Sequence, residues 1–389
     1  MADFARFRMK GAVQRSVLMV TALAAAAVLA LFLLPAAALL LTGTTSAQAQ
    51  TGPEVIASGL NNPRGLSFSP DGGLYVAEAG TGGSGPCFQG PEGPSCFGHS
   101  GSVTRVDGNG QSRVLTGLPS FAADPGGGFG IGPSDVSFQG RGGMYVTVGL
   151  GLDLDFSKTI PELGDMGQLV RARLSQGDWK TVADLADFED ANNPTGDEEN
   201  VNPNSVLATP GGQVVADAGA NDLLRVAANG TVSVLATFPN RLVDAPPFLG
   251  LPPGTQIPMD AVPTSVTKGP DGALYVGQLT GFPFPVGGAN VYRIVPGQAP
   301  EVFASGFTNI IDIGFDPTGT LYVLEIFQNG LLSGDPTGAL IRVDADGTQH
   351  LVMSTGLNTP GGLALRNGAA YVSNCGTCAG GGTVLRIPL

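Results

Sequence analysis

Leu74-Tyr75-Val76, Met144-Tyr145-Val146, Gln213-Val214-Val215, Leu274-Tyr275-Val276, Leu321-Tyr322-Val323 and Ala370-Tyr371-Val372 are six versions of one apolar triplet. Each follows a turn, such as Pro70-Asp71-Gly72-Gly73, and precedes a second apolar segment. Strand-turn-strand units that recur at roughly 40 to 50 residues are typical of β-propeller blades. We therefore predict an all-β repeat protein.

One unit contains four strands. In the fifth unit, alternating apolar residues and turn signals predict strands at 311–315, 321–325, 340–344 and 350–354. First strands begin near Pro63, Pro133, Pro203, Pro263, Ile310 and Pro360. The chain is expected to form a six-bladed β-propeller with four-stranded blades.

The sixth unit ends at Leu389 after its third strand. The missing strand is found at the other end of the repeats, where Glu54-Val55-Ile56-Ala57-Ser58-Gly59-Leu60 closely matches Glu301-Val302-Phe303-Ala304-Ser305-Gly306-Phe307. We expect the N-terminal strand to complete the last blade, because closing the ring leaves no free sheet edge.

The N-terminus has the layout of a secretory signal. Four basic residues precede an apolar run at 17–41 and the small-residue motif Ala47-Gln48-Ala49. We assign 1–49 as a signal peptide and 50–389 as one propeller; an uncleaved run would be a membrane anchor. The protein is then secreted, periplasmic or at the cell surface, and we expect a monomer. Its formal net charge of −13 argues against nucleic-acid binding.

All four cysteines lie in two corresponding loops. Cys87 and Cys96 follow the second strand of unit one, and Cys375 and Cys378 follow that of unit six. Export favours disulfides over a redox or metal site. Pairing within each loop and pairing between the two loops both remain open.

The two ends of the blades differ in loop length. Turns after first and third strands are short, whereas connections after second and fourth strands hold every long insertion: 79–101, 119–133, 149–167, 186–203, 239–263 and 326–338. We call the second end the loop-rich face and the first the plain face. Binding residues concentrate on long loops, so the site is expected at the loop-rich mouth of the central channel.

Two polar columns obey the repeat. The third strands carry Arg105, Arg171, Arg225, Arg293, Arg342 and Arg386, and the second strands end in Glu78, Val148, Asp217, Gln278, Glu325 and Asn374. We interpret the arginines as structural and expect the second column to supply their partners. Contact of these second-strand residues with a ligand or cation is the minority interpretation.

Polar residues that break the repeat are better candidates for function. Asp135, Asn204 and Asp312 lie at first-strand starts, where carboxylate and amide oxygens suit calcium. Capping of turns is the equally weighted alternative. The only histidines are His99 and His350, and His350 lies in a fourth strand at the outside of the ring, which argues against a histidine-based catalytic triad or a multi-histidine metal site. No phosphate-binding P-loop is present.

Two loop segments are unusual. The stretch 181–224 lacks Lys and Arg but carries Asp184, Asp187, Glu189, Asp190, Asp197, Glu198 and Glu199. It is either a solvated loop or a site for a cation or basic partner. Pro246-Pro247-Phe248-Leu249 and Phe282-Pro283-Phe284-Pro285 form either a hydrophobic rim for an aromatic ligand or lids on neighbouring blades.

The sequence from Ala57 to Leu66, the loop with Cys87 and Cys96, and Gly130-Ile131-Gly132-Pro133-Ser134-Asp135 resemble the ScyD/ScyE family of exported propellers. The resemblance covers nearly all of 53–389 and implies a six-bladed NHL-like propeller outside the cytoplasm. It supplies no catalytic residues. A weaker resemblance to gluconolactonase-like and strictosidine-synthase-like propellers implies a channel calcium near Asn204 and Asp312, although blade one offers Arg64-Gly65 in place of the matching glutamate.

Three functions follow from these observations. The first is a scaffold that binds a small molecule, polysaccharide or protein on the loop-rich face. The second is a calcium-dependent lactonase or hydrolase that uses the channel. The third is an enzyme acting on an aromatic metabolite. The sequence leaves open whether the protein is an enzyme, and calcium is the single cofactor that it suggests.

Overall fold

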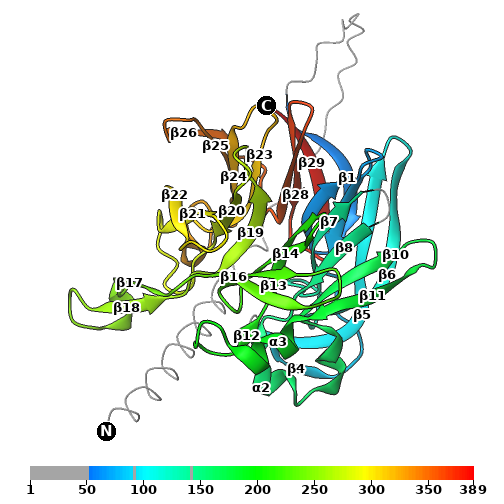
Figure 1. The fold of residues 1–389 in the computed structure, drawn as a ribbon, viewed down its shortest axis with the longest axis horizontal. Helices are drawn as coiled ribbons and strands as arrows, with labels where there is room; N and C mark the ends of the chain where they lie inside the picture. The colour runs from blue at the N-terminus through cyan, green and yellow to red at the C-terminus, as the bar shows by residue number, and fades with distance from the viewer. Residues whose placement is uncertain (1–51, 91–92, 141–142) are drawn as a thin grey trace, which may run out of the picture. The chain divides into compact units, whose positions relative to one another are not determined.

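The computed structural model describes residues 52–90, 93–140 and 143–389. The signal or anchor assignment at 1–49 lies outside these residues. From Pro53 to Leu389 the chain forms one compact unit, a six-bladed β-propeller (Figure 1).

Each blade is an antiparallel sheet of four main strands. Blade one contains β2 (Pro63–Phe68), β3 (Leu74–Glu78), β5 (Gly93–Asp107) and β6 (Gly110–Ala123); blade two contains β7 (Pro133–Gln139), β8 (Gly143–Val148), β10 (Gln168–Arg173) and β11 (Asp178–Asp184). Blade three contains β13 (Pro203–Thr209), β14 (Gly212–Asp217), β15 (Asp222–Val226) and β16 (Val232–Thr237); blade four contains β19 (Pro263–Lys268), β20 (Leu274–Gln278), β21 (Ala289–Ile294) and β22 (Glu301–Phe307). Blade five contains β23 (Ile310–Phe315), β24 (Leu321–Glu325), β25 (Ala339–Val343) and β26 (Gln349–Met353); blade six contains β27 (Gly362–Arg366), β28 (Ala369–Asn374), β29 (Gly382–Pro388) and β1 (Glu54–Leu60).

The repeated triplet explains the packing between blades. Its last residue has no exposed surface in any blade: Val76, Val146, Val215, Val276, Val323 and Val372. A β-branched side chain is stiff and fits the pleated surface between two sheets, so one valine per blade contributes to the packing of each blade against its neighbours.

The ring closes as predicted from the sequence. Strand β1 pairs antiparallel with β29, with Glu54 opposite Arg386 and Leu60 opposite Gly382. In Figure 1 the blue β1 lies beside the red β29. Each first strand also contacts the first strands of both neighbouring blades, including β27 with β2. Hydrogen bonds between the first and last segments of the repeats thus complete blade six.

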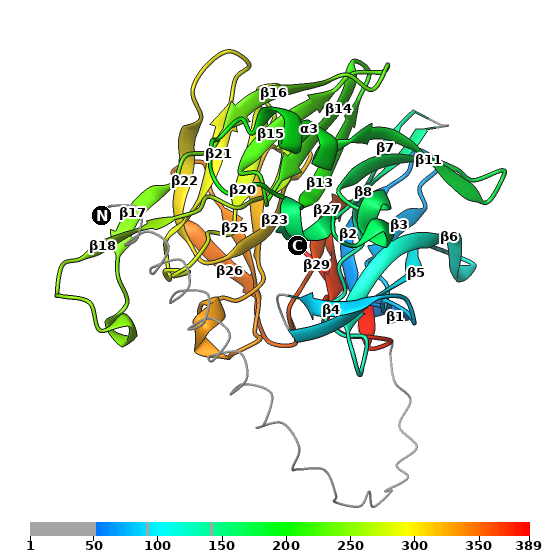
Figure 2. The same cartoon turned by 90° about the horizontal axis from the view of Figure 1, so that it is seen from below.

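The loop-rich face contains ordered elements of its own. They are β4 (Cys87–Gly90), β9 (Leu152–Asp153), α2 (Leu154–Ser157), η1 (Pro161–Asp165), α3 (Leu185–Asn192), β12 (Asn200–Val201), β17 (Arg241–Asp244), η2 (Pro247–Leu249), β18 (Gln256–Met259) and η3 (Leu331–Ser333). Figure 2 shows the β17–β18 hairpin extending away from the blade sheets, as does Figure 1.

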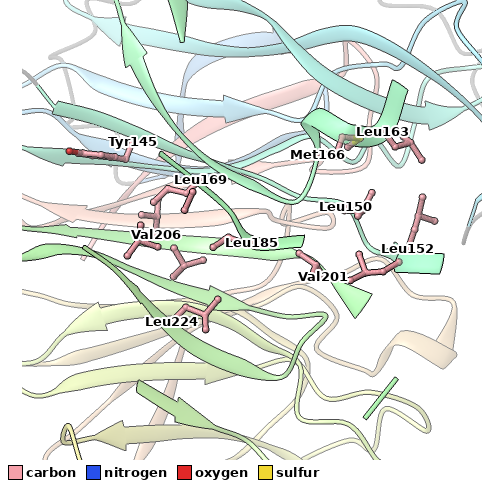
Figure 3. Close-up of a cluster of buried hydrophobic side chains, with 14 of the residues drawn as sticks. Tyr145, Leu150, Leu152, Leu163, Met166, Leu169, Leu185, Val201, Val206 and Leu224 are labelled. Atoms are coloured by element: carbon pink, nitrogen blue, oxygen red, sulfur yellow. The ribbon is translucent and has the colours of Figure 1, made fainter. Parts of the chain in front are cut away.

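The insertions of blades one to three share a hydrophobic core. Leu150, Leu163, Met166, Leu185 and Val201 are buried together with residues of the blade sheets (Figure 3). Because these loops bury apolar side chains against one another, they form a folded layer above the blades. We call this the loop layer.

The disulfides form within each loop. Cys87 pairs with Cys96, and Cys375 pairs with Cys378. The alternative of bonds between the loops of blades one and six is therefore not adopted. Within the described ranges, no helix has the length and apolar character needed to span a bilayer.

Candidate functional site

The first strands begin with a bulge that separates the three candidate calcium ligands. Pairing of β7 with β8 skips from Pro133 to Asp135, and pairing of β23 with β24 skips from Ile310 to Asp312. In β13 the skipped residue is Asn204. Asp135 and Asp312 therefore occupy equivalent positions, whereas Asn204 lies one position earlier.

Asp135 and Asp312 each bridge two blades. Asp135 Oδ2 accepts hydrogen bonds from Ser205 Oγ and the Val206 N–H of the next blade, both at 2.9 Å. Asp312 Oδ2 accepts one from the Leu363 N–H at 2.7 Å. The equivalent Ser205 Oγ accepts from the Val266 N–H at 3.3 Å. This column therefore links first strands around the ring.

The residues in the bulge make a second set of links. Asn204 Nδ2 donates to the Thr264 carbonyl at 2.6 Å, and Thr264 Oγ1 donates to the Ile310 carbonyl at 2.8 Å. Arg64 donates to the Gly130 carbonyl at 2.7 Å, and burial lowers its pKa to about 10. The amide oxygen of Asn204 is thus the part of this side chain left for a ligand.

The surroundings of Asp135 and Asp312 raise the pKa of both carboxyl groups and so favour their neutral forms. Burial raises the pKa of Asp135 to about 6. Burial, followed by the charge of Asp135, raises the pKa of Asp312 to about 8. The two residues come from blades two and five, and among the described residues neither forms an ion pair. A cation near Asp312 would offset the cost that burial and the charge of Asp135 add to its ionisation.

The arginine column is structural, but its predicted partners are wrong. Arg105 pairs with Asp71 and Asp107, Arg293 with Asp271, Arg342 with Asp344 and Arg386 with Glu54. Arg171 lies over the Tyr145 ring, and Arg225 donates to the Gly211 carbonyl. Aspartates at the neighbouring turns reach the half-exposed guanidinium groups, whereas the second-strand column is buried at the loop-rich end.

The second-strand column instead holds the backbone at the entrance to blades one, five and six. Glu78 accepts from the Asn61 N–H at 2.7 Å, Glu325 from the Thr308 N–H at 2.6 Å and Asn374 from the Asn358 N–H at 2.7 Å. These groups stabilise the connection into the first strand.

The acidic stretch at 181–224 has two kinds of residue. Most of its carboxylates are at least partly exposed, but Glu189 is buried and contributes a charge beside Asp217. Asp222, which the sequence reasoning missed, is also buried. The available signal was its position directly after the hairpin turn that follows Asp217.

The two phenylalanine-containing segments, 246–249 and 282–285, meet on the loop-rich face. The rings of Phe248 and Phe282 have centroids 6.2 Å apart, as do those of Phe282 and Phe284, and both pairs are edge-to-face. Phe248 remains 56% exposed. We call these three residues the aromatic cluster. It joins the hairpin insertion to blade four and leaves Phe248 accessible to solvent.

A cleft of about 680 Å³ lies between the outer strands of blades three and four. Its lining includes Phe238, Arg241, Asn290, Tyr292 and Pro300. It is remote from the first strands, so it is not the channel site expected from the sequence.

One set of three potential metal ligands has its atoms within 4.8 Å of one another among the described residues: Cys87, Cys96 and Asp124. The two cysteines are disulfide-bonded, so they provide no thiolates for a metal.

Comparisons with known proteins identify the fold. No family model matches the chain, and no curated protein matches it. A solved structure of a protein of unknown function from Bacteroides thetaiotaomicron is 11% identical, with a TM-score of 0.52, covering 86% of this chain and 75% of that one. A putative gluconolactonase is 13% identical, with a TM-score of 0.49, covering 87% and 93% respectively.

An auxiliary nutrient binding protein from Bacteroides thetaiotaomicron is 9% identical, with a TM-score of 0.49, covering 85% of this chain and 70% of that one. At such low identities the similarity shows the fold alone.

Proposed function

We propose that this protein is an exported binding propeller that holds a ligand or partner on its loop-rich face. The observation that carries the proposal is the distribution of exposed aromatic rings. Four phenylalanines of the described residues have large exposed areas: Phe129, Phe156 and Phe248 lie on loop-rich-face insertions, and Phe303 lies on an outer strand. A rigid ring presenting open aromatic faces suits sugar rings, aromatic compounds or apolar protein side chains.

Two further features support binding. The candidate residues of the channel are engaged in hydrogen bonds between blades, which is a structural use. The aromatic cluster, by contrast, is built from two insertions that the blades do not need. The resemblance to the exported ScyD/ScyE propellers and the two disulfides agree with a role outside the cytoplasm.

The test compares two phenylalanines of similar exposure. Native protein, Phe248→Ala and Phe303→Ala are screened against polysaccharides, aromatic compounds and exported proteins of the source cells. Phe303 is 48% exposed and packs edge-to-face on Tyr275, so it matches Phe248 in type and setting. We expect Phe248→Ala to weaken binding at least about tenfold, the usual effect of removing a central aromatic contact. Equal effects of both changes, or binding unaffected by Phe248→Ala, would contradict the proposal.

A calcium-dependent lactonase is the second candidate, favoured by the charge of Asp135 acting on Asp312, which forms no ion pair among the described residues. A calcium ion there would polarise a lactone carbonyl. Calcium-dependent hydrolysis of aliphatic lactones that falls at least about a hundredfold in Asp312→Asn would support this activity. Hydrolysis unchanged by Asp312→Asn would exclude this site.

A further inference from the structure

Two buried aspartates face each other at the loop-rich end of blade three. Asp217 ends β14, Asp222 begins β15, and the two are direct partners across the hairpin. Both side chains are completely buried. Directly opposed residues in antiparallel strands point to the same side, with Cβ atoms about 4.5 to 5.5 Å apart, and like charges there repel.

Two more oxygen-bearing side chains reach the same hairpin from the loop layer. Glu189 on α3 is 2% exposed; the charge of Asp217 acts on it, and its own charge acts on Asp222. Strand β12, which contacts α3, carries Asn200. The Asn200 Oδ1 atom lies 2.8 Å from the position that a Cβ on Gly219 would take, inside the turn between the two aspartates. We call Glu189, Asn200, Asp217 and Asp222 the blade-three cluster.

Most carboxylate and amide oxygens of the cluster accept no hydrogen bond. Asp217 Oδ1 accepts from three backbone N–H groups, those of Asn202, Gly219 and Ala220. The other Asp217 oxygen, both oxygens of Asp222, both of Glu189 and Asn200 Oδ1 are buried with no hydrogen-bond partner among the described residues. Because buried polar atoms are normally paired, six such oxygens in one place require an explanation.

Arginine or lysine does not supply the missing charge. The stretch 181–224 has neither residue, and the unpaired oxygens of Glu189, Asp217 and Asp222 accept no hydrogen bond from one elsewhere among the described residues. Burial, with the neighbouring carboxylates, raises the pKa of Glu189 to about 7 and that of Asp222 well above its usual range. A hard cation would satisfy all of these oxygens together, whereas a water molecule has two protons to donate.

We propose that Glu189, Asn200, Asp217 and Asp222 form a calcium site on the loop-rich face of blade three, separate from the channel. Carboxylate and amide oxygens are the ligands that calcium prefers. Magnesium is disfavoured because it keeps several of its waters, and a cluster with fully buried aspartates leaves little room for them.

Binding would also order the loop layer. The ligand oxygens of Glu189, Asp217 and Asp222 are not all within 4.8 Å of one another. An ion held at calcium–oxygen distances of about 2.3 to 2.6 Å would therefore draw α3 toward the β14–β15 turn. The site thus couples calcium to the arrangement of an insertion on the proposed binding face.

Calcium titration of the chelator-treated full-length protein tests the site. We expect the melting temperature to rise by about 5 °C at a hundredfold excess of calcium over its Kd. Asp222→Asn and Glu189→Gln should each weaken calcium affinity at least about tenfold, as expected when a charged ligand is replaced by a neutral one. Glu162→Gln, which neutralises an exposed carboxylate of the loop layer outside both proposed calcium sites, is the control and should retain the native response.

The direction in which Asp222→Asn shifts the melting temperature distinguishes a cation site from a cluster with a purely structural role. Without calcium, Asp222→Asn should melt at or above the native temperature, because it removes like-charge repulsion. With calcium it should melt below the native protein. Calcium should also slow backbone hydrogen exchange in α3.

Three results would overturn the proposal: no response to 10 mM calcium, an unchanged response in Asp222→Asn, or a loss of the response in Glu162→Gln as large as that in Glu189→Gln. Magnesium acting as strongly as calcium would overturn the assignment of the ion. The test uses no ligand of the proposed binding face, so its failure is distinguishable from failure of the binding function.

Discussion

Blades one and three end their second strands with a buried carboxylate at the same position in the repeat, yet the two side chains have opposite surroundings. Glu78 in blade one accepts from Ser102 Oγ, Thr104 Oγ1 and Arg113, besides the Asn61 N–H. Asp217 in blade three faces Asp222 and Glu189. Both are fully buried. The repeat thus determines where a carboxylate is placed, whereas its neighbours determine whether that carboxylate stabilises the blade or needs a cation.

The largest expected effect comes from removing the cation of blade one. Arg113 Nη2 contacts Glu78 Oε2 at 2.7 Å. Arg113→Ala leaves a buried carboxylate without its counter-charge and should reduce the free energy of unfolding by about 3 kcal/mol. Urea denaturation measures the loss. The control is Arg105→Ala, which breaks half-exposed pairs and should cost less than about 1 kcal/mol. Equal losses would mean that burial does not distinguish the two arginines.

A smaller effect is expected from crowding the turn of blade three. A Cβ at Gly219 would lie 2.7 Å from the Asn202 backbone nitrogen and 2.8 Å from the Val201 carbonyl carbon. Because backbone cannot move aside cheaply, Gly219→Ala should cost about 2 kcal/mol and weaken calcium binding. The matched control is Gly108→Ala in a blade-one turn, where no atom lies within 4 Å of the new Cβ. Similar melting temperatures for both variants would show that β12 is not held against the turn.

Glu325 in blade five is intermediate between Glu78 and Asp222, because its buried carboxyl group accepts one hydrogen bond. Glu325 accepts from the Thr308 N–H, and burial raises its pKa to about 7 from an ordinary 4.5. Between these pH values the folded protein keeps a proton that the unfolded chain has lost, so native stability falls as pH rises. Glu325→Gln keeps the acceptor for Thr308 and removes this loss.

The expected gain of Glu325→Gln is about 1 to 2 kcal/mol at pH 8 and near zero at pH 4.5. Thermal unfolding across this range measures it. A constant difference between variant and native protein at all pH values would show that Glu325 ionises normally when folded.

The sequence was sufficient to predict the ring, because the fold depends on local patterns repeated six times. The triplets, the turns and the match between 54–60 and 301–307 each predicted strand order or closure. Separate long-range contacts were not needed for this prediction, since one blade repeats the geometry of the next.

The partners of individual side chains were harder to predict. The arginine column and the second-strand column look complementary by charge, but Arg105 reaches Asp71 and Glu78 reaches Arg113. The position of a residue along its strand predicts which residues of the neighbouring strands lie beside it. It does not predict which direction a long flexible side chain takes.

The blade-three cluster shows the same limit more clearly. Glu189 appeared within an acidic stretch that resembles a solvated loop, and Asp222 resembled an ordinary turn residue. Their burial depends on the loop layer, whose core joins Leu150 from one insertion to Leu185 and Val201 from the next. Insertions break the repeat, so their packing cannot be copied from another blade.

The smallest expected effect tests whether a nearby cation alone makes a buried carboxylate acceptable in this column. Gln278 of blade four is buried, its Oε1 accepts from Arg241 Nη2 at 3.2 Å, and its Nε2 has no hydrogen-bond partner among the described residues. Gln278→Glu replaces that unpaired donor with an oxygen near a guanidinium group. The gain in attraction should offset the cost of burying charge, so the free energy of unfolding should change by less than about 1 kcal/mol. Val148→Glu, at the blade-two position, is the comparison, because Val148 is fully buried in an apolar cluster. If both glutamates destabilise the protein equally, proximity to arginine does not explain why Glu78 is tolerated, and its three donors other than Arg113 must do so.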